Sequence, residues 1–359
     1  MFDTLTKGKK PVIISGPCSA ESEEQVIATC MAIAKTGKVD MLRAGIWKPR
    51  TRPNTFEGVG APGLKWLKEA GRRTNLPVAV EVANTKHVEE ALKSEIDVLW
   101  VGARTTVNPF SVQEIADALR GTSIPVMIKN PLNADEDLWS GALERMIHVG
   151  LTDLALIHRG FAQYGKSVYR NEPKWQIPLE MKRRFPTVPM ICDPSHITGK
   201  RENIAAISQQ ALDMDFDGLM IESHITPDQA LSDAAQQVTP QALKEIIDSL
   251  IVRSSSVLDE ALLDKLEALR KQMDIIDDDL VKLLGERMKV AEEIGLVKKE
   301  KGLTILQVKR WEEIIERVTK LGGFQGLSEN FLHRYLSAIH QESIDHQNEV
   351  MNRTELEEE

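Results

Sequence analysis

The stretch Met190-Ile191-Cys192-Asp193-Pro194-Ser195-His196 contains the pattern from which the fold can be predicted. A short apolar run leads directly into polar side chains, and the proline fixes a turn that presents the histidine outward. Seven other apolar runs end in the same way, in polar residues suited to binding or catalysis. They are Val12-Ile13-Ile14, Met41-Leu42-Arg43, Val78-Ala79-Val80-Glu81, Val98-Leu99-Trp100-Val101, Val126-Met127-Ile128-Lys129-Asn130, Leu154-Ala155-Leu156-Ile157 and Leu219-Met220-Ile221-Glu222.

Helix-length stretches separate these eight runs along the chain. Continuous apolar runs of this kind are typical of parallel strands that are buried on both faces of a sheet. Eight of them predict a (β/α)8 TIM barrel, in which the active site lies at the C-terminal ends of the strands. The polar residues that follow the runs are therefore expected to meet at one end of the barrel.

The sequence changes character after residue 250, where residues 251–258 include a serine run that is typical of a linker. We predict a barrel domain over residues 1–250 and an all-α domain over residues 259–359, which ends in an acidic tail. In the second domain, apolar residues recur in steps of four and three, the pattern of an amphipathic helix with a coiled-coil-like seam. The seam residues are Leu262, Leu266, Leu269, Met273, Ile276, Leu280 and Leu283.

The first helix of this second domain is predicted to run to about Lys301, which is about forty residues or roughly 60 Å. Two shorter helices are expected over roughly 305–321 and 327–352. A helix of such length cannot bury its seam alone. We therefore expect a homodimer through the helical domain, and a higher oligomer remains open.

Composition excludes several classes of partner. The 359-residue chain has a net charge of −9, which argues against nucleic acid or an anionic membrane as the main partner. Its three cysteines do not suggest a disulfide framework and fit a reducing compartment. No stretch approaches the ~18–20 apolar residues of a membrane span, and the first ten residues lack an apolar signal region. A cytoplasmic location is expected.

Four side chains at or after the predicted strand ends have the chemistry of metal ligands: Cys18, His196, Glu222 and Asp233. Thiolate, imidazole and carboxylate groups suit Mn²⁺, Fe²⁺, Co²⁺ or Zn²⁺. Taken alone, Cys18 is better explained as a small buried apolar residue, and Glu222 as the partner of a lysine. The four together predict a site for a divalent metal ion.

Basic residues are also predicted to converge on the barrel mouth: Arg43, Lys48, Arg104, Lys129 and Arg159. They would repel one another unless an anion joined them. Arginine suits bidentate contact with phosphate or carboxylate, while lysine acts as a point charge. These cations predict a phosphorylated substrate.

The loop Lys48-Pro49-Arg50-Thr51 offers two cations and a hydroxyl on a proline-stiffened turn, which is enough for a second phosphate. On its own this tetrapeptide is better explained as a solvated basic turn.

From about residue 10 to 245 the chain resembles the 3-deoxy-D-arabino-heptulosonate 7-phosphate (DAHP) synthase family, in its short form without long loop insertions. A related eight-carbon ulosonate phosphate (KDO8P) synthase carries an Ala-Asn-Arg-Ser type sequence where this chain has Pro49-Arg50-Thr51, which favours the heptulosonate enzyme. The motifs are Gly16-Pro17-Cys18-Ser19, Lys48-Pro49-Arg50-Thr51, Gly102-Ala103-Arg104, His158-Arg159-Gly160, Asp193-Pro194-Ser195-His196 and Leu231-Ser232-Asp233.

This resemblance implies condensation of phosphoenolpyruvate with erythrose 4-phosphate and release of phosphate. A divalent ion on the four predicted ligands would polarise the aldehyde as a Lewis acid. Lys48 or His196 would deliver a proton to the developing alkoxide.

The resemblance also assigns the predicted cations to the two substrates. The phosphate of phosphoenolpyruvate is assigned to Arg104, Lys129 and Arg159, its carboxylate to Arg43 and Lys48, and the erythrose phosphate to Arg50 and Thr51 beside Pro49. One departure is Lys129-Asn130-Pro131, where close relatives often have Lys-Arg-Gly.

In the helical domain, Arg287 falls on the apolar seam, where a charge is costly unless a ligand or carboxylate faces it. Lys298 lies about three turns further on and shares nearly the same face. Arg270 lies roughly 100° away around the helix and is expected to point toward a partner chain. Ser343 and Gln347 are one turn apart on the last helix and share a face. Taken singly, Arg270 and Lys298 are equally consistent with solvated helix residues.

Residues 259 to 350 resemble the all-helical (AroQ) class of chorismate mutase. The implied reaction is the rearrangement of chorismate to prephenate. It requires a dianion held in its reactive conformer and charge stabilised at the breaking ether oxygen. The matching residues are Leu269-Arg270-Lys271, Asp277, Glu286-Arg287, Lys298, Arg310, Ser343 and Gln347.

The resemblance implies that Arg287, together with Arg270 of the other protomer, binds the two carboxylates. Lys298 and Gln347 would donate to the ether oxygen, and Arg310 and Ser343 match further substrate positions.

Two departures affect this site, because the family usually has acidic residues where this chain has Gln307 and Trp311. The glutamate at the latter position normally contacts the ring hydroxyl of the substrate. Trp311 cannot accept that hydrogen bond, and Glu312 or Glu313 is the expected substitute.

Together the resemblances imply a bifunctional enzyme of the shikimate pathway, on the route to aromatic amino acids. Because the two steps are not consecutive, we expect regulation, in which prephenate or chorismate bound to the helical domain alters the barrel's activity. The alternatives are a KDO8P-synthase-like barrel, a helical domain that only senses a ligand and dimerises, and an unrelated barrel aldolase, which has no need of phosphoenolpyruvate.

Overall fold

A computed structural model describes residues 1–2, 11–49, 55–165, 167–253 and 260–353. The chain separates into two compact units, Met1–Ser255 and Ser256–Glu359. No helix in the described ranges is long and apolar enough to cross a membrane.

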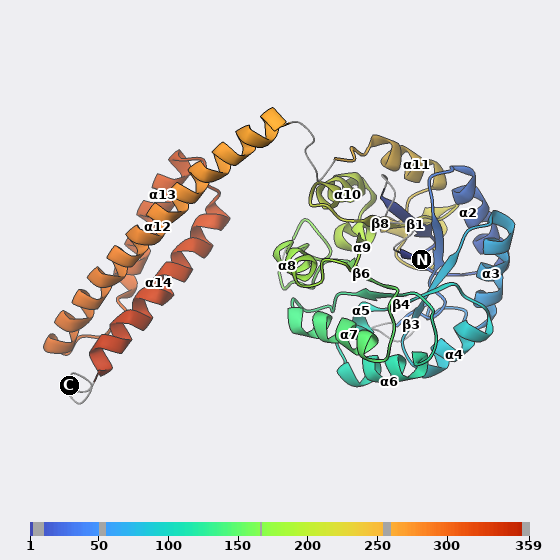
Figure 1. The fold of residues 1–359 in the computed structure, drawn as a ribbon, viewed down its shortest axis with the longest axis horizontal. Helices are drawn as coiled ribbons and strands as arrows, with labels where there is room; N and C mark the ends of the chain where they lie inside the picture. Colours follow the sequence, from blue (N-terminus) through green and yellow to red (C-terminus); the bar gives the residue numbers. More distant parts are fainter. Residues whose placement is uncertain (3–10, 50–54, 166, 254–259, 354–359) are drawn as a thin grey trace. The chain divides into compact units, whose positions relative to one another are not determined.

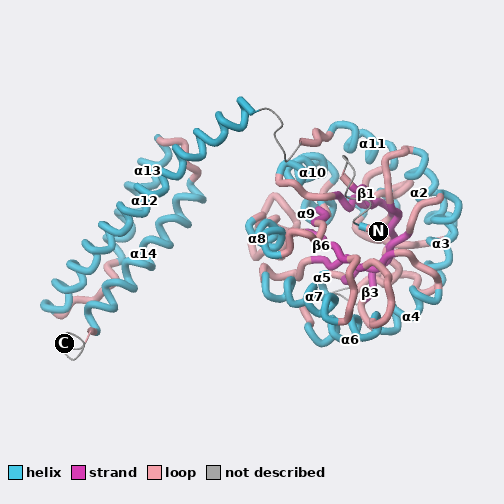
Figure 2. The backbone as a smooth tube through the Cα atoms, in the orientation of Figure 1, coloured by secondary structure: helices cyan, strands magenta, loops and turns pink. Residues whose placement is uncertain are grey.

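Eight parallel strands close into a barrel in the order β1-β2-β3-β4-β5-β6-β7-β8 (Figures 1 and 2). All eight predicted runs are strands, so the predicted fold class is confirmed. The strands are β1 Val12–Gly16, β2 Met41–Ala44, β3 Val78–Val82, β4 Val98–Val101, β5 Val126–Lys129, β6 Leu154–His158, β7 Met190–Cys192 and β8 Gly218–Glu222.

The strands are apolar throughout because both faces of the sheet are buried. On β1, Val12 and Ile14 belong to the cluster inside the barrel, while Ile13 packs in the cluster between sheet and helices. Phe2 joins the interior cluster, and its N–H donates to Asp153 Oδ1 at 3.0 Å, just before β6. Phe2 thus packs at the N-terminal ends of the strands, at the opposite end from the predicted site.

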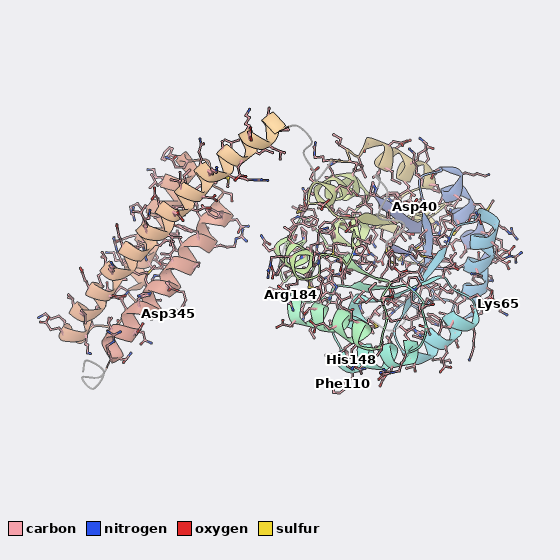
Figure 3. The ribbon with its side chains drawn as sticks, in the orientation of Figure 1. Asp40, Lys65, Phe110, His148, Arg184 and Asp345 are labelled. Carbon is pink, nitrogen blue, oxygen red and sulfur yellow. The ribbon has the colours of Figure 1, made fainter. Side chains whose placement is uncertain are left out.

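Helices surround this barrel, and polar side chains on their outer faces, such as Lys65, His148 and Arg184, point to solvent (Figure 3). The α-helices are α2 Glu23–Lys35, α3 Pro62–Thr74, α4 Thr85–Lys93, α5 Ala103–Thr106, α6 Pro109–Leu119, α7 Glu136–His148, α8 Gln176–Arg184, α9 Pro194–Thr198, α10 Ile204–Asp213 and α11 Pro240–Ser249. The 3₁₀ turns are η1 Arg201–Asn203, η2 Pro227–Gln229 and η3 Ala234–Gln236.

The second unit consists of α12 Glu260–Lys301, α13 Val308–Phe324 and α14 Glu329–Asn352, with α14 packed against both other helices. The predicted long helix is confirmed at 42 residues. It ends just before Gly302, which has a left-handed φ of 64°. Ser328 caps α14 by accepting from the N–H of Phe331 at 3.3 Å. The two shorter helices also lie close to their predicted ranges.

Candidate active sites

Glu222, the last residue of β8, is a fully buried carboxylate in the barrel site. Arg43 of β2 donates to its Oε1 at 2.6 Å, and Gln236 of η3 donates to its Oε2 at 2.7 Å. Burial alone would raise the pKa of Glu222, but His196, Arg43 and Lys48 lower it to about 2. The carboxylate is therefore ionised at neutral pH.

Gly16 allows β1 and β2 to approach closely beside this pair. It has φ +155°, and a Cβ built there would lie 1.8 Å from the carbonyl oxygen of Arg43. The glycine of the predicted Gly16-Pro17-Cys18-Ser19 motif is thus required by the backbone.

Cys18 follows β1 and lies between a cation and a carboxylate. Its Sγ is 3.0 Å from Lys48 Nζ and donates to Asp233 Oδ2 at 3.4 Å. Burial, together with the charge of Glu222, raises the pKa of the Cys18 thiol to about 12. The sulfur is therefore protonated in the absence of a metal ion. Gln237 holds the Cys18 backbone by accepting its N–H at 2.8 Å.

His196 lies on the short helix α9, which Asp193 caps by accepting the His196 N–H at 3.1 Å. The imidazole Nδ1 is 2.8 Å from Asp193 Oδ2, and Nε2 is 3.8 Å from Glu222 Oε1. Burial lowers the pKa of His196 even though Asp193 opposes this shift. The neutral imidazole that results has the protonation state a metal ligand requires.

Asp233 lies in a left-handed turn and is held by Arg170, whose NH1 donates to Oδ1 at 3.0 Å. Arg170 also donates to Gln236 Oε1 at 2.7 Å, and Gln236 in turn contacts Glu222. Burial alone would raise the pKa of Asp233, but Arg170, His196 and Lys48 lower it by more, so the carboxylate is ionised. Sequence reasoning missed Arg170, Gln236 and Gln237, because single polar residues between the main helices and strands carry no signal of their own.

The four predicted metal ligands are gathered in two neighbouring pairs, Cys18 with Asp233 and His196 with Glu222. No group of three or more such side chains among the described residues is arranged as a ready metal cluster. The donor set nevertheless fits a divalent ion, because it combines sulfur, imidazole and two ionised carboxylates. Lys48 and Arg43 contribute positive charge beside these groups.

Lys129 and Arg159, predicted to bind phosphate, are both buried at strand ends. Lys129 pairs with Asp193 at 2.7 Å, and Arg159 NH1 donates to Asn171 Oδ1 at 2.7 Å. Burial lowers the pKa of Arg159 to about 10, so it stays cationic at neutral pH. Asn130, the departure noted in the sequence, accepts the Arg159 N–H at 2.7 Å and so fixes that strand end.

Arg43, predicted to lie near a substrate carboxylate, pairs its guanidinium with Glu222 and lies 4.9 Å from the ring centroid of Trp100. Arg104 is exposed at the start of α5. Pro49 is half-buried, whereas Arg50 and Thr51 lie outside the described residues.

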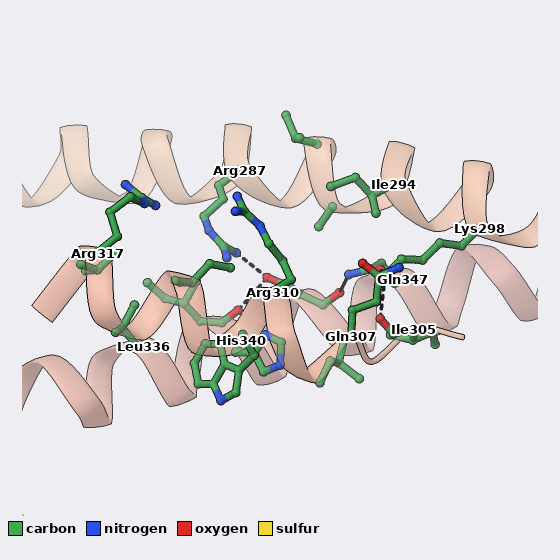
Figure 4. A pocket seen from close by; sticks show the side chains of 18 of the residues that line it. Arg287, Ile294, Lys298, Ile305, Gln307, Arg310, Arg317, Leu336, His340 and Gln347 are labelled. Carbon is green, nitrogen blue, oxygen red and sulfur yellow. Dashed lines mark hydrogen bonds between the residues drawn. The ribbon is translucent and has the colours of Figure 1, made fainter. Parts of the chain in front are cut away.

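The helical unit contains a cavity of about 650 Å³ between its three helices (Figure 4). The described lining includes cations and no carboxylate, which suits the dianion that was predicted to bind here. The polar and aromatic lining residues are Arg287, Lys298, Gln307, Arg310, Trp311, Arg317, Tyr335, His340, Ser343 and Gln347.

Predicted residues from different helices meet in this cavity. Arg287 donates to Ser343 Oγ, and Lys298 Nζ donates to Gln347 Oε1 at 2.9 Å and to the Ile305 carbonyl at 2.5 Å. Burial lowers the pKa of both Arg287 and Lys298. An anion in the cavity would therefore be stabilised by cations that have already lost part of their hydration.

Arg270, which was predicted to point toward a partner chain, does not line its own chain's cavity; it is exposed and 3.7 Å from Glu267. Neither Glu312 nor Glu313 lines the cavity, so the predicted substitution for Trp311 is wrong: Glu313 instead accepts from Arg310 at 3.0 Å. Ile314, Arg317 and Val318 of α13, and His340 of α14, also line the cavity and were not predicted, because their helix faces depend on the packing of the helices.

Comparison with known proteins identifies both domains. The sequence pattern described as "DAHP synthetase I family" matches residues 4–258, and that of "Chorismate mutase type II" matches residues 269–348. The chain is 30% identical over 236 residues to a phospho-2-dehydro-3-deoxyheptonate aldolase of Thermotoga maritima, over 66% of this chain and 67% of the relative. A 2-dehydro-3-deoxyphosphooctonate aldolase of Syntrophotalea carbinolica is 25% identical, over 68% and 91%.

Solved structures give the same result for the barrel. A crystal structure of the Thermotoga maritima aldolase, a DAHP synthase, superposes with a TM-score of 0.60 at 28% identity, covering 66% of this chain and 67% of that one. A truncated form of the Thermotoga maritima DAHP synthase superposes with a TM-score of 0.58 at 26% identity, covering 66% and 84%.

Proposed function

The chain belongs to the DAHP synthetase I family and carries a chorismate mutase type II domain. From this premise we propose that each domain catalyses one reaction, with the residues described above. The barrel condenses phosphoenolpyruvate with erythrose 4-phosphate in a metal-dependent reaction. The helical unit rearranges chorismate to prephenate, and it regulates the barrel.

The observation that carries the barrel proposal is the meeting of ionised carboxylates, a thiol and buried cations at the C-terminal ends of the strands. Cys18, His196, Glu222 and Asp233 would hold the divalent ion, which when bound polarises the aldehyde of erythrose 4-phosphate. Its positive charge would also favour the thiolate of Cys18, whose pKa burial otherwise raises. Mn²⁺, Fe²⁺, Co²⁺ and Zn²⁺ all suit this donor set.

The cations position phosphoenolpyruvate. Lys129 and Arg159, together with Arg104, bind the phosphate of phosphoenolpyruvate, and Lys48 lies near its carboxylate. The enol carbon attacks the aldehyde, water adds to the resulting cationic centre, and the phosphohemiketal collapses with release of phosphate. Lys48, whose pKa is raised because Cys18 and Glu222 outweigh burial, is protonated and is the donor to the developing alkoxide.

Cys18→Ser should weaken divalent-ion binding by at least ~10–100-fold. That range is typical of losing a residue that only supports a metal ligand, and Cys18 is proposed to be a ligand itself. Metal affinity is measured by equilibrium dialysis with Mn²⁺ after chelation, and the matched control is Cys30→Ser, a buried cysteine of α2. The unsubstituted protein, reloaded with metal, should turn over erythrose 4-phosphate and not arabinose 5-phosphate. Equal metal affinity in both variants, or preference for the five-carbon sugar, would contradict the proposal.

The helical unit is proposed to act as a mutase because its cavity presents cations to a dianion without any opposing carboxylate among the described lining. Arg287 would bind one carboxylate of chorismate. Lys298 and Gln347, already in contact, would donate to the ether oxygen on which charge develops. Arg310 and Ser343, which also line the cavity, would make further contacts with the substrate.

We further propose that two chains pair through α12. At ~1.5 Å per residue the 42-residue α12 is about 63 Å long, whereas the 24-residue α14 covers at most about 36 Å of it. Leu269, Met273 and Ile276 are accordingly 49%, 63% and 58% exposed. A second copy of the same seam would bury them, and it would bring a partner's Arg270 to the chorismate site.

The full-length protein should elute with a mass of about 80 kDa, twice the 40.2 kDa of the chain, in size-exclusion chromatography with light scattering. Ile276→Asp places an unpaired charge on the seam and should shift the mass to one chain. Asp278→Lys, about 160° around the helix, is the control and should leave it unchanged. A 40 kDa species without substitution would contradict the pairing.

Regulation is proposed because the two reactions share a chain without being consecutive. Prephenate or chorismate bound in the helical cavity would alter the synthase rate by differential affinity for two states of the protein.

Removing residues 252–359 should therefore abolish inhibition of heptulosonate phosphate formation by prephenate. Rates with and without the ligand are compared in the full chain and in the shortened one. Unchanged inhibition of the isolated barrel would place the effector site in the barrel and contradict the proposal.

A further inference from the structure

Trp311 of α13 and His340 of α14 form a stacked pair on the wall of the helical cavity. Their ring centroids are 4.0 Å apart and the ring planes are inclined by 11°. Both residues line the cavity, and Figure 4 shows His340 beside it, on the same side as Leu336. Trp311, which stands where the family usually has an acidic residue, therefore stacks on a specific partner. Because that partner is a histidine, this wall of the cavity keeps a polar side chain.

The His340 imidazole is short of hydrogen-bond partners. Its Nε2 is buried, and no described residue hydrogen-bonds it. An unsatisfied buried nitrogen costs free energy, and buried polar groups in native proteins nearly always have a partner. In a cavity built for a ligand, the ligand is the natural source of that partner.

His340 is also kept neutral. Burial lowers its pKa, and the positive charges of Arg287 and Lys298 lower it further. A neutral imidazole carries one N–H donor and one acceptor nitrogen, whereas the imidazolium has only donors. Neutral His340 can therefore accept a hydrogen bond from a hydroxyl group, which the arginines and lysine of the same cavity cannot do.

We propose that His340, held in place by stacking on Trp311, binds the ring hydroxyl of chorismate and thereby replaces the carboxylate that this chain lacks. The inference rests on the proposed mutase function and names a specificity residue within it. The cations take the two carboxylates of the substrate, and the neutral imidazole takes the uncharged polar group. Gln307, which also lines the cavity, is the competing candidate.

The experiment compares chorismate with an analogue in which hydrogen replaces the ring hydroxyl, using the full-length protein and three variants. His340→Phe keeps an aromatic ring on Trp311 and removes the nitrogens, His340→Gln restores a hydrogen-bonding group, and Gln307→Leu tests the competitor. Synthase activity and helical content of each variant control for folding.

For the unsubstituted protein, kcat/KM should be about tenfold lower on the analogue than on chorismate. In His340→Phe, kcat/KM on chorismate should fall about tenfold, so that this variant no longer discriminates between chorismate and the analogue. His340→Gln should regain part of the discrimination. Equal losses of His340→Phe on both substrates, or loss of discrimination only in Gln307→Leu, would overturn this inference alone. Absence of chorismate turnover by the unsubstituted protein would overturn the mutase function and the inference with it.

Discussion

The ion pair between Arg43 and Glu222 sets the constraint on which the barrel site depends. Both groups are almost completely removed from water, and separating such a pair leaves a buried charge at a cost of about 3–5 kcal/mol. The pair joins β2 to β8, and Gln236 extends it to Arg170 and so to the Asp233 loop. The orientation of the two proposed carboxylate ligands, Glu222 and Asp233, therefore follows from how the barrel neutralises charge in its interior.

The helical unit balances charge in the opposite way. Its cavity brings together Arg287 and Lys298 without a carboxylate among the described lining residues, so a ligand can supply the compensating charge. A barrel site with its own carboxylates suits a metal ion as well as an anionic substrate, whereas an uncompensated cationic cavity suits a dianion. The chemistry assigned to each unit follows from this difference.

The sequence predicts the structure where the spacing of apolar residues determines which face of a strand or helix is buried. It does not predict which side chains contact one another. Eight apolar runs predicted the strands, and the seam predicted α12, because burial dictates both patterns. Arg43 pairs with Glu222, 179 positions away in the sequence. This ion pair depends on the register of strands across a closed sheet, and no local sequence pattern predicts it. The stacking of His340 on Trp311 likewise depends on how two helices pack.

The most direct test of two active sites in one chain uses the full-length protein with Lys48→Ala and Arg287→Ala. Aliquots of each preparation are assayed for heptulosonate phosphate formation and for prephenate formation. The account predicts that the unsubstituted protein makes both products. Each substitution should remove one activity by about 100-fold or more, as for loss of a preorganised charge contact, and spare the other. A protein that makes no prephenate, or variants that lose both activities together, would contradict it.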